Sequence, residues 1–141
     1  MILLDVNPLV YAFRNDSVEH ERYRRWLVSI VDGDAAFGMS PQVLGSVLRI
    51  STNPRIYREP VAVARAVEFA NWLMDQPHCQ IVAPGPRHWG IFCDLCVKAQ
   101  AQGNLVQDAW FAALAIESGC EWITLDRDYA RFPGLRWRTP F

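Results

Sequence analysis

The sequence of 141 residues lacks a long apolar run. No stretch approaches the roughly 18–20 consecutive apolar residues that a membrane-spanning helix needs. Its first residues have neither the basic start nor the small-residue cleavage site of a signal peptide. No repeat, low-complexity tract or long linker divides it. These absences predict one cytoplasmic domain over residues 1–141, with no membrane partner.

A strong net charge is also lacking. The formal net charge is −1 at pH 7, and Lys98 is the only lysine among the 14 basic residues. A nucleic-acid partner would therefore have to be held locally, by a basic patch or through metal ions. One set of arginines is a candidate phosphate-positioning patch, although a solvated surface with helix salt bridges explains it equally well. The set is Arg14, Arg22, Arg24, Arg25, Arg49, Arg55 and Arg58.

The sequence contains no convincing zinc, redox or nucleophile motif. Cys93 and Cys96 have CxxC spacing, but they fall in a helical pattern, and no second Cys or His pair completes four zinc ligands. We expect the four cysteines to be buried structural thiols. The three histidines accompany no Ser or Cys nucleophile, so we expect structural or surface roles for them. No glycine-rich phosphate loop occurs.

The sequence does contain a regular alternation of short apolar runs and helical patterns. The expected strands are residues 1–5, 35–39, 79–83, 121–125 and 135–137. Expected helices begin at the cap–proline pairs Asn7-Pro8 and Ser40-Pro41, and others cover residues 19–31, 60–74, 89–102 and 106–118. This order predicts an α/β fold of three layers, α/β/α, around a central parallel sheet.

Aspartates occur where such a fold places its ligand sites. Asp5 and Asp126 each follow an apolar run, and the carboxyl ends of parallel strands meet at one sheet edge. If those strands are neighbours, the two backbones lie roughly 5 Å apart. Asp108 is expected in the first turn of a helix whose next eight residues are all apolar, and Asp128 lies on the loop beyond Asp126.

Converging carboxylates repel one another, and a bound Mg²⁺ or Mn²⁺ removes that conflict because hard cations prefer oxygen ligands. Such a site suits phosphodiester hydrolysis. We expect Asp5, Asp108 and Asp126 to be the metal ligands and, with Asp128, the catalytic residues. Asp5 and Asp108 would hold the cation, while Asp126, helped by Asp128, completes the shell or orients the attacking water. Each aspartate alone is equally explained as a cap, turn former or solvated charge.

Several stretches form a pattern from end to end of the chain. They are Asp5-Val-Asn-Pro-Leu-Val-Tyr-Ala12, Ser40-Pro-Gln-Val-Leu44, Thr52-Asn-Pro54, Gly103-Asn-Leu-Val-Gln-Asp-Ala109, Ala112-Ala-Leu-Ala-Ile116 and Thr124-Leu-Asp-Arg-Asp-Tyr-Ala-Arg-Phe-Pro-Gly134. Together they resemble the PIN-domain ribonucleases, and most closely the VapC toxins of bacterial type II toxin–antitoxin pairs.

The resemblance implies a PIN-like fold and an endoribonuclease that depends on Mg²⁺ or Mn²⁺. Its acidic residues match Asp5, Asp108, Asp126 and Asp128 in this sequence. It also implies a homodimer, a transfer or ribosomal RNA substrate, and a VapB-type antitoxin that inserts a segment near the acidic pocket.

One position departs from the family pattern: Ser46 stands where the family usually carries a glutamate. The alternative is therefore a catalytically weakened PIN-fold module that binds RNA or an antitoxin. A third class, phosphoryl-transfer proteins of receiver or haloacid-dehalogenase type, also has an aspartate after the first strand. That class is disfavoured because Asp5-Val-Asn7 breaks the Asp-x-Asp motif and no lysine follows a late strand.

Overall fold

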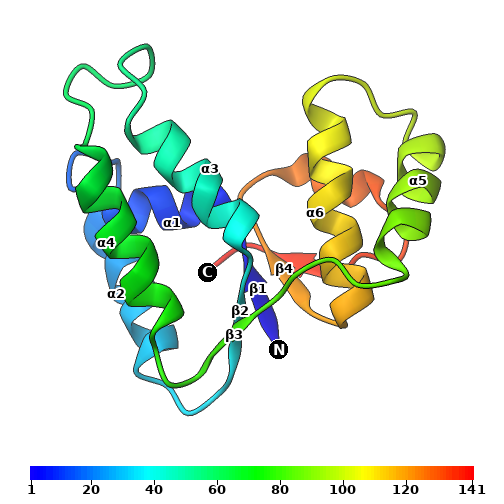
Figure 1. The fold of residues 1–141 in the computed structure, drawn as a ribbon, viewed down its shortest axis with the longest axis horizontal. Coiled ribbons are helices and arrows are strands. Elements are labelled where there is room, and N and C mark those ends of the chain that lie inside the picture. The colour runs from blue at the N-terminus through cyan, green and yellow to red at the C-terminus, as the bar shows by residue number, and fades with distance from the viewer.

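A five-stranded sheet forms the middle layer of the protein, which is described over residues 1–141 by a computed structural model (Figure 1). The strands are β1 (Ile2–Leu4), β2 (Phe37–Met39), β3 (Cys79–Ile81), β4 (Glu121–Ile123) and β5 (Trp137–Arg138). Their order is β3-β2-β1-β4-β5, and every neighbouring pair is parallel. The predicted α/β fold with a central parallel sheet is confirmed.

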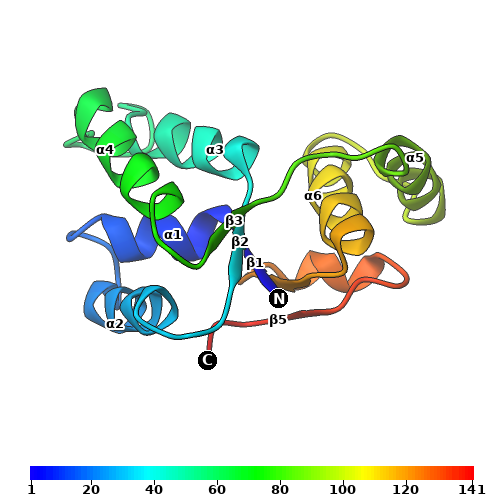
Figure 2. The same ribbon diagram turned by 60° about the horizontal axis from the view of Figure 1, so that its bottom comes forward.

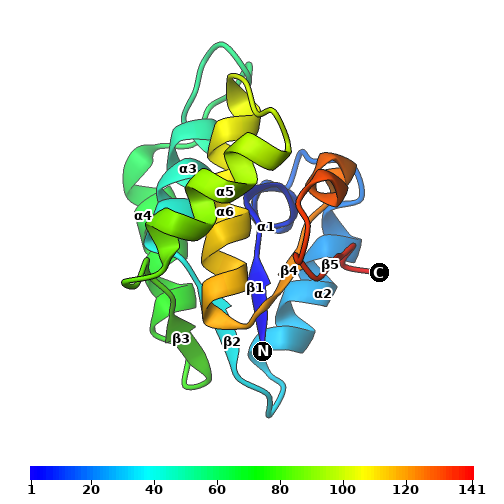
Figure 3. The same ribbon diagram turned by 90° about the vertical axis from the view of Figure 1, so that its right-hand side faces the viewer.

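Helices cover both faces of the sheet. On one face lie α1 (Val6–Phe13), α2 (His20–Val31), α3 (Pro41–Ser51) and α4 (Val63–Met74) (Figure 2). On the other face lie α5 (His88–Lys98) and α6 (Asn104–Ser118), which are in front of the sheet in Figure 3. A short 3-10 helix, η1 (Arg127–Arg131), follows β4. None of the helices has the length and apolar character needed to cross a membrane.

The central strands are buried from both sides. Leu3 and Leu4 of β1 and Trp122 and Ile123 of β4 are completely buried. Both faces of these strands need apolar side chains because helices cover both, which explains their continuous apolar runs. Burial of each such side chain stabilises the folded state by roughly 1.5–3 kcal/mol.

Two helix starts follow the expected capping chemistry, one of them with a different cap. Ser40 caps α3, and its hydroxyl accepts a hydrogen bond from the backbone N–H of Gln42 at 3.2 Å, as predicted. Helix α1, however, is capped by Asp5 and not by Asn7. One carboxylate oxygen of Asp5 accepts a hydrogen bond from the backbone N–H of Val6 at 2.7 Å. The structural interpretation of Asp5 as a cap is therefore correct, whatever else Asp5 does.

Two predicted helices are shorter than expected. Helix α4 begins at Val63 and not at Pro60, because the backbone N–H of Val61 bonds to the carbonyl of Ser51 and holds this segment against the end of α3. Helix α5 ends at Lys98, before Gln100, whose φ of 51° is left-handed and stops the helix.

Strand order reverses at β1, and this positions the site. Strands β2 and β3 lie on one side of β1, and β4 and β5 lie on the other. The connections to the two sides place α1–α4 on one face and α5 and α6 on the opposite face (Figure 1). The carboxyl ends of β1 and β4 therefore open into a crevice, which is where α/β sheets bind their ligands.

Candidate active site

A pocket of about 340 Å³ lies at the carboxyl ends of β1 and β4, between α3 and α6. Asp5 lines it from the end of β1, Asp108 from α6, and Asp126 from the segment after β4. Ser46 and Arg49 line it from α3. The structure thus brings three of the four predicted site residues to one pocket.

Asp5 is the most enclosed of the three carboxylates, with 7% of its surface exposed. Its second carboxylate oxygen accepts a hydrogen bond from the hydroxyl of Thr124 at 2.5 Å. Burial raises the pKa of Asp5 to about 6, although the Thr124 hydroxyl and the Val6 N–H both act to lower it. The negative charges of Asp108 and Asp126 raise that pKa further. The ionised form of Asp5 is consequently destabilised by its surroundings near neutral pH.

Thr124 is a site residue that the sequence interpretation missed. Leu4 pairs with Ile123, so Thr124 and not Asp126 lies across from Asp5. The expectation that Asp5 and Asp126 sit one strand spacing apart is therefore wrong, because β4 ends at Ile123. Thr124 is fully buried, and its hydroxyl also accepts a hydrogen bond from the backbone N–H of Asp126 at 3.0 Å. One hydroxyl therefore connects both acidic segments.

Asp108 faces the pocket from the second turn of α6, because this helix begins at Asn104, two residues earlier than predicted. The hydroxyl of Tyr129 donates to a carboxylate oxygen of Asp108 at 3.4 Å. Burial raises the pKa of Asp108 to about 6, and the charge of Asp126 adds to that increase. Burial and the nearby carboxylates also raise the pKa of Tyr129 well above its ordinary value, so Tyr129 stays a donor. Sequence reasoning missed Tyr129 too.

Asp126 and Asp128 have different surroundings. Asp126 caps η1, and its carboxylate accepts a hydrogen bond from the backbone N–H of Asp128 at 2.8 Å. The side chain of Asp128 is 60% exposed and lies 3.8 Å from Arg131. It lines a neighbouring hollow of about 460 Å³ and not the acidic pocket. Asp128 therefore supports Asp126 through its backbone, while its carboxylate sits apart.

The donor set fits a hard divalent cation in its chemistry. Carboxylate oxygens are the ligands that Mg²⁺ and Mn²⁺ prefer, and a cation would offset the burial and the mutual repulsion that raise the pKa values of Asp5 and Asp108. No three acidic, histidine or cysteine side chains are gathered closely enough to hold one ion together. Mg²⁺ usually takes only one or two carboxylates and keeps several waters, so this spacing is compatible with it.

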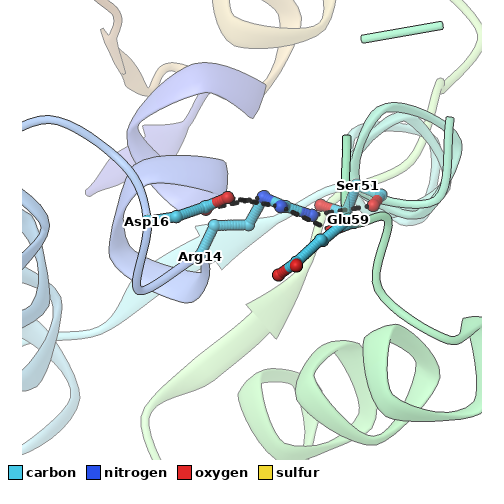
Figure 4. A network of polar contacts seen from close by, with 4 residues as sticks. All are labelled: Arg14, Asp16, Ser51 and Glu59. Atoms are coloured by element: carbon cyan, nitrogen blue, oxygen red, sulfur yellow. Dashed lines mark hydrogen bonds and ion pairs between the residues drawn. The ribbon is translucent and has the colours of Figure 1, made fainter. Parts of the chain in front are cut away.

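Arg14 has a structural role (Figure 4). Its guanidinium donates to the carboxylate of Asp16 at 2.7 and 3.0 Å, and to the backbone carbonyls of Ser51 at 3.1 Å and Glu59 at 2.9 Å. It also lies 3.5 Å from the ring centroid of Tyr57. Only 4% of Arg14 is exposed. It joins the end of α1 to the end of α3, so a phosphate-positioning role is wrong for this arginine.

The other arginines of the proposed patch divide by location. On α2, Arg22 pairs with Glu19 and Arg24 pairs with Glu21, both within 3.2 Å. These are exposed helix salt bridges, the alternative that the sequence left open. Within the proposed set, only Arg49 lines the acidic pocket.

The cysteines and histidines take no part in this pocket. All four cysteines are free, but the expectation that all are buried is wrong, because only Cys120 is. The half-buried ones are Cys79, Cys93 and Cys96. His88 is 2% exposed, and its ring Nε2 lies 2.9 Å from the carbonyl of Trp110, which confirms a structural role.

The parallel sheet, and the aspartates gathered where its strand order reverses, agree with the PIN domain that the sequence resembles. The family model for the PIN domain matches residues 2–135 of this chain.

Relatives place the chain more narrowly. Ribonuclease VapC43 of Mycobacterium tuberculosis is 39% identical over 140 residues, which cover 99% of this chain and 95% of that protein. Ribonuclease VapC25 of the same organism is also 39% identical, and the match covers 99% of both chains. The chain therefore belongs to the VapC ribonucleases of the PIN-domain family.

Solved structures agree with the fold. VapBC2 of Rickettsia felis, bound to a DNA fragment from its promoter, superposes with a TM-score of 0.71 at 17% identity, covering 99% of this chain and 98% of that one. VapC20 of Mycobacterium tuberculosis, described as a sarcin–ricin loop cleaving toxin, gives a TM-score of 0.68 at 15% identity, with 96% and 99% covered. At these identities the likeness concerns the fold alone.

Proposed function

We propose that this protein is the toxin of a type II toxin–antitoxin pair, an endoribonuclease that hydrolyses RNA phosphodiester bonds with the help of Mg²⁺ or Mn²⁺. Residues 1–141 act as one PIN domain. The observation that carries the proposal is the convergence of Asp5, Asp108 and Asp126 on one pocket at the reversal point of the sheet, with raised pKa values for two of them. Membership of the VapC ribonucleases supports the same reaction.

Each acidic residue has a role in this proposal. Asp5 and Asp108 hold the cation, because burial, with the charges of neighbouring carboxylates, raises the pKa of both and a cation would stabilise their ionised forms. Asp126, held by the backbone N–H of Asp128, completes the outer shell or orients the attacking water. When bound, a divalent cation lowers the pKa of water and neutralises charge on the phosphoryl oxygens. Thr124 positions Asp5 and the backbone of Asp126 relative to each other.

The partners follow from membership of this family. We propose a VapB-type antitoxin as the inhibitor, because the chain belongs to the VapC ribonucleases and a similar fold occurs in the VapBC-1 structure of Haemophilus influenzae, with a TM-score of 0.72 at 16% identity. We also propose a homodimer and a transfer or ribosomal RNA substrate. Such a substrate places the site of action in the cytoplasm.

Cleavage of total bacterial RNA tests the proposal. The purified, antitoxin-free protein is incubated with Mg²⁺, with Mn²⁺ and with EDTA, beside Asp5→Asn. The matched control is Asp34→Asn, which removes an exposed carboxylate before β2, at the opposite edge of the sheet. Discrete fragments that need metal, persist in Asp34→Asn and vanish in Asp5→Asn are expected. Cleavage that survives EDTA or Asp5→Asn would contradict the assignment.

A second candidate is a PIN-fold module that binds RNA or an antitoxin without cleaving. The observation in its favour is Ser46, which lines the pocket and supplies no carboxylate from α3. If the folded protein binds RNA or a VapB-type antitoxin but leaves total RNA intact with either metal, this candidate replaces the first.

A further inference from the structure

The wall that α3 presents to the acidic pocket carries no negative charge. Ser46 and Arg49 both line the pocket from this helix, and a spacing of three residues puts them on one helix face. The opposite wall carries Asp108 from α6, and the floor carries Asp5. The pocket is therefore polarised, with carboxylates on one side and a guanidinium on the other.

Arg49 is available to a ligand. It is exposed, and it forms no ion pair with any carboxylate of the protein, including the aspartates of the same pocket. Arg14, by contrast, is fully engaged with backbone carbonyls and with Asp16. An unpaired guanidinium at the rim of an anionic pocket is suited to bind an anion that enters from solvent, and Arg binds phosphate in a bidentate manner.

The charges of the pocket agree with this role. Three carboxylates, one guanidinium and one divalent cation make the pocket formally neutral, so a phosphate can approach the acidic floor without net repulsion. Burial decreases from Asp5, through Asp108, to Arg49, so the guanidinium lies at the rim and the carboxylates lie deeper. A phosphate held at the rim is therefore not the one that lies over the carboxylates.

The pocket continues into a second hollow. Asn104, Asp108 and Asp126 line both spaces, whereas Arg49 lines only the first and Arg131 lines only the second. The acidic centre thus lies between two connected hollows, the first with the unpaired Arg49 and the second with Arg131, which is paired with Asp128. This shape fits a single RNA strand that crosses the centre with its backbone, and single-strand binding grooves typically follow the phosphates with positive charge.

We propose that Arg49 is a substrate-binding residue of this ribonuclease, which holds the RNA phosphate next to the one that is cleaved. The inference rests on the proposed function and adds the path of the RNA across the site. The RNA passes from the α3 wall, over Asp5 and Asp108, towards Arg131.

Steady-state kinetics test this role. The substrate is a short single-stranded RNA oligonucleotide that carries a cleavage site mapped from the total-RNA digest. The variants are Arg49→Gln, Arg49→Lys and the matched control Arg25→Gln, which removes an exposed, unpaired arginine from α2, outside the pocket. Because a neighbouring phosphate is bound equally in the ground and transition states, Arg49→Gln should raise KM about tenfold and leave kcat nearly unchanged. Arg49→Lys should recover part of that loss, and Arg25→Gln should match the wild type.

Binding gives a second readout. In an Asp5→Asn background, which prevents cleavage, fluorescence anisotropy of the same labelled RNA is measured over a range of salt concentrations. Removing one phosphate contact should reduce the slope of log affinity against log salt by about 0.7. Arg49→Lys keeps the charge and should keep that slope.

The outcomes separate the two proposals. If the wild type cleaves RNA but Arg49→Gln behaves like Arg25→Gln in KM and in salt slope, the inference is wrong and the proposed function stands. A fall in kcat at unchanged KM would place Arg49 on the cleaved phosphate and also overturn it. If the folded wild type neither cleaves nor binds RNA, the proposed function fails, and the inference fails with it.

Discussion

Replacement of Asp5 by asparagine should stabilise the metal-free protein near neutral pH and abolish RNA cleavage. The two effects have one cause, because Asp5 is an anion buried without a cation to balance it. Asparagine has the same shape, keeps an oxygen to accept the Val6 N–H that caps α1, and carries no charge. The substitution therefore removes the buried charge and the proposed metal ligand together.

The magnitude follows from the pKa of Asp5. Burial raises this pKa from 3.8 to about 6, a difference that corresponds to about 3 kcal/mol once the carboxyl is ionised. The exchange weakens the hydrogen bond from the Thr124 hydroxyl, at a cost of about 1 kcal/mol. We expect a net gain of about 2 kcal/mol in the free energy of unfolding, or about 6 °C in Tm for a domain of this size.

The pH dependence has a definite sign. The pKa of Asp5 is higher in the folded protein than in the unfolded chain, so protonation of Asp5 favours folding. Below about pH 4 the buried carboxyl is protonated and does not destabilise the wild type. The wild type loses stability as the pH rises through about 6, because this carboxyl ionises. The advantage of Asp5→Asn should therefore be absent near pH 4 and complete above neutrality. Burial also raises the pKa of Asp108 to about 6, so Asp108 adds to the wild-type slope in the same direction.

Urea unfolding in EDTA, followed by tryptophan fluorescence at both pH values, measures this difference. Asp34→Asn is the control for loss of an exposed carboxylate. Adding Mn²⁺ should stabilise the wild type by about 2.7 kcal/mol at a hundredfold excess over its Kd, and should stabilise Asp5→Asn much less. A variant that is less stable than the wild type at neutral pH in EDTA, or whose advantage is the same near pH 4, would refute the reasoning.

Three further substitutions test the surroundings of the site. Thr124→Val removes the hydroxyl shared by Asp5 and the backbone of Asp126, so it should cost about 1–3 kcal/mol in urea unfolding and lower kcat without moving KM. Ser46→Glu adds a fourth carboxylate to the pocket, so it should tighten Mn²⁺ binding, measured by electron paramagnetic resonance, and destabilise the protein in EDTA; unchanged Mn²⁺ affinity would show that α3 stands too far from the ion. Arg14→Met removes the hydrogen bonds to the carbonyls of Ser51 and Glu59, of which only Ser51 keeps another donor, the Val61 N–H. It should cost about 1–3 kcal/mol in urea unfolding, whereas a neutral result would contradict its structural role.

Much of the architecture was predictable from local patterns. Apolar runs alternating with helical spacing indicated a parallel sheet covered on both faces, because only strands buried from both sides need continuous apolar residues. The position of Asp5 directly after β1 located the pocket, since carboxyl ends of parallel strands share one edge. The motif around Asp108 and the stretch from Thr124 to Gly134 indicated the PIN family, which the family match confirms.

Only the tertiary structure decided which groups meet. The register of β4 against β1 places Thr124, and not Asp126, across from Asp5. Local sequence does not determine that register, because a strand that is apolar on both faces carries no alternation to choose between neighbouring pairings. The tertiary structure also decided the roles of the arginines. Arg14 donates to backbone carbonyls and Arg49 forms no ion pair at the pocket, although the sequence placed both in one candidate patch. The sequence alone thus determined the elements and the kind of chemistry. Which side chains can take part in that chemistry was decided by their burial and by their hydrogen-bond partners on distant segments, because both depend on how the whole chain packs.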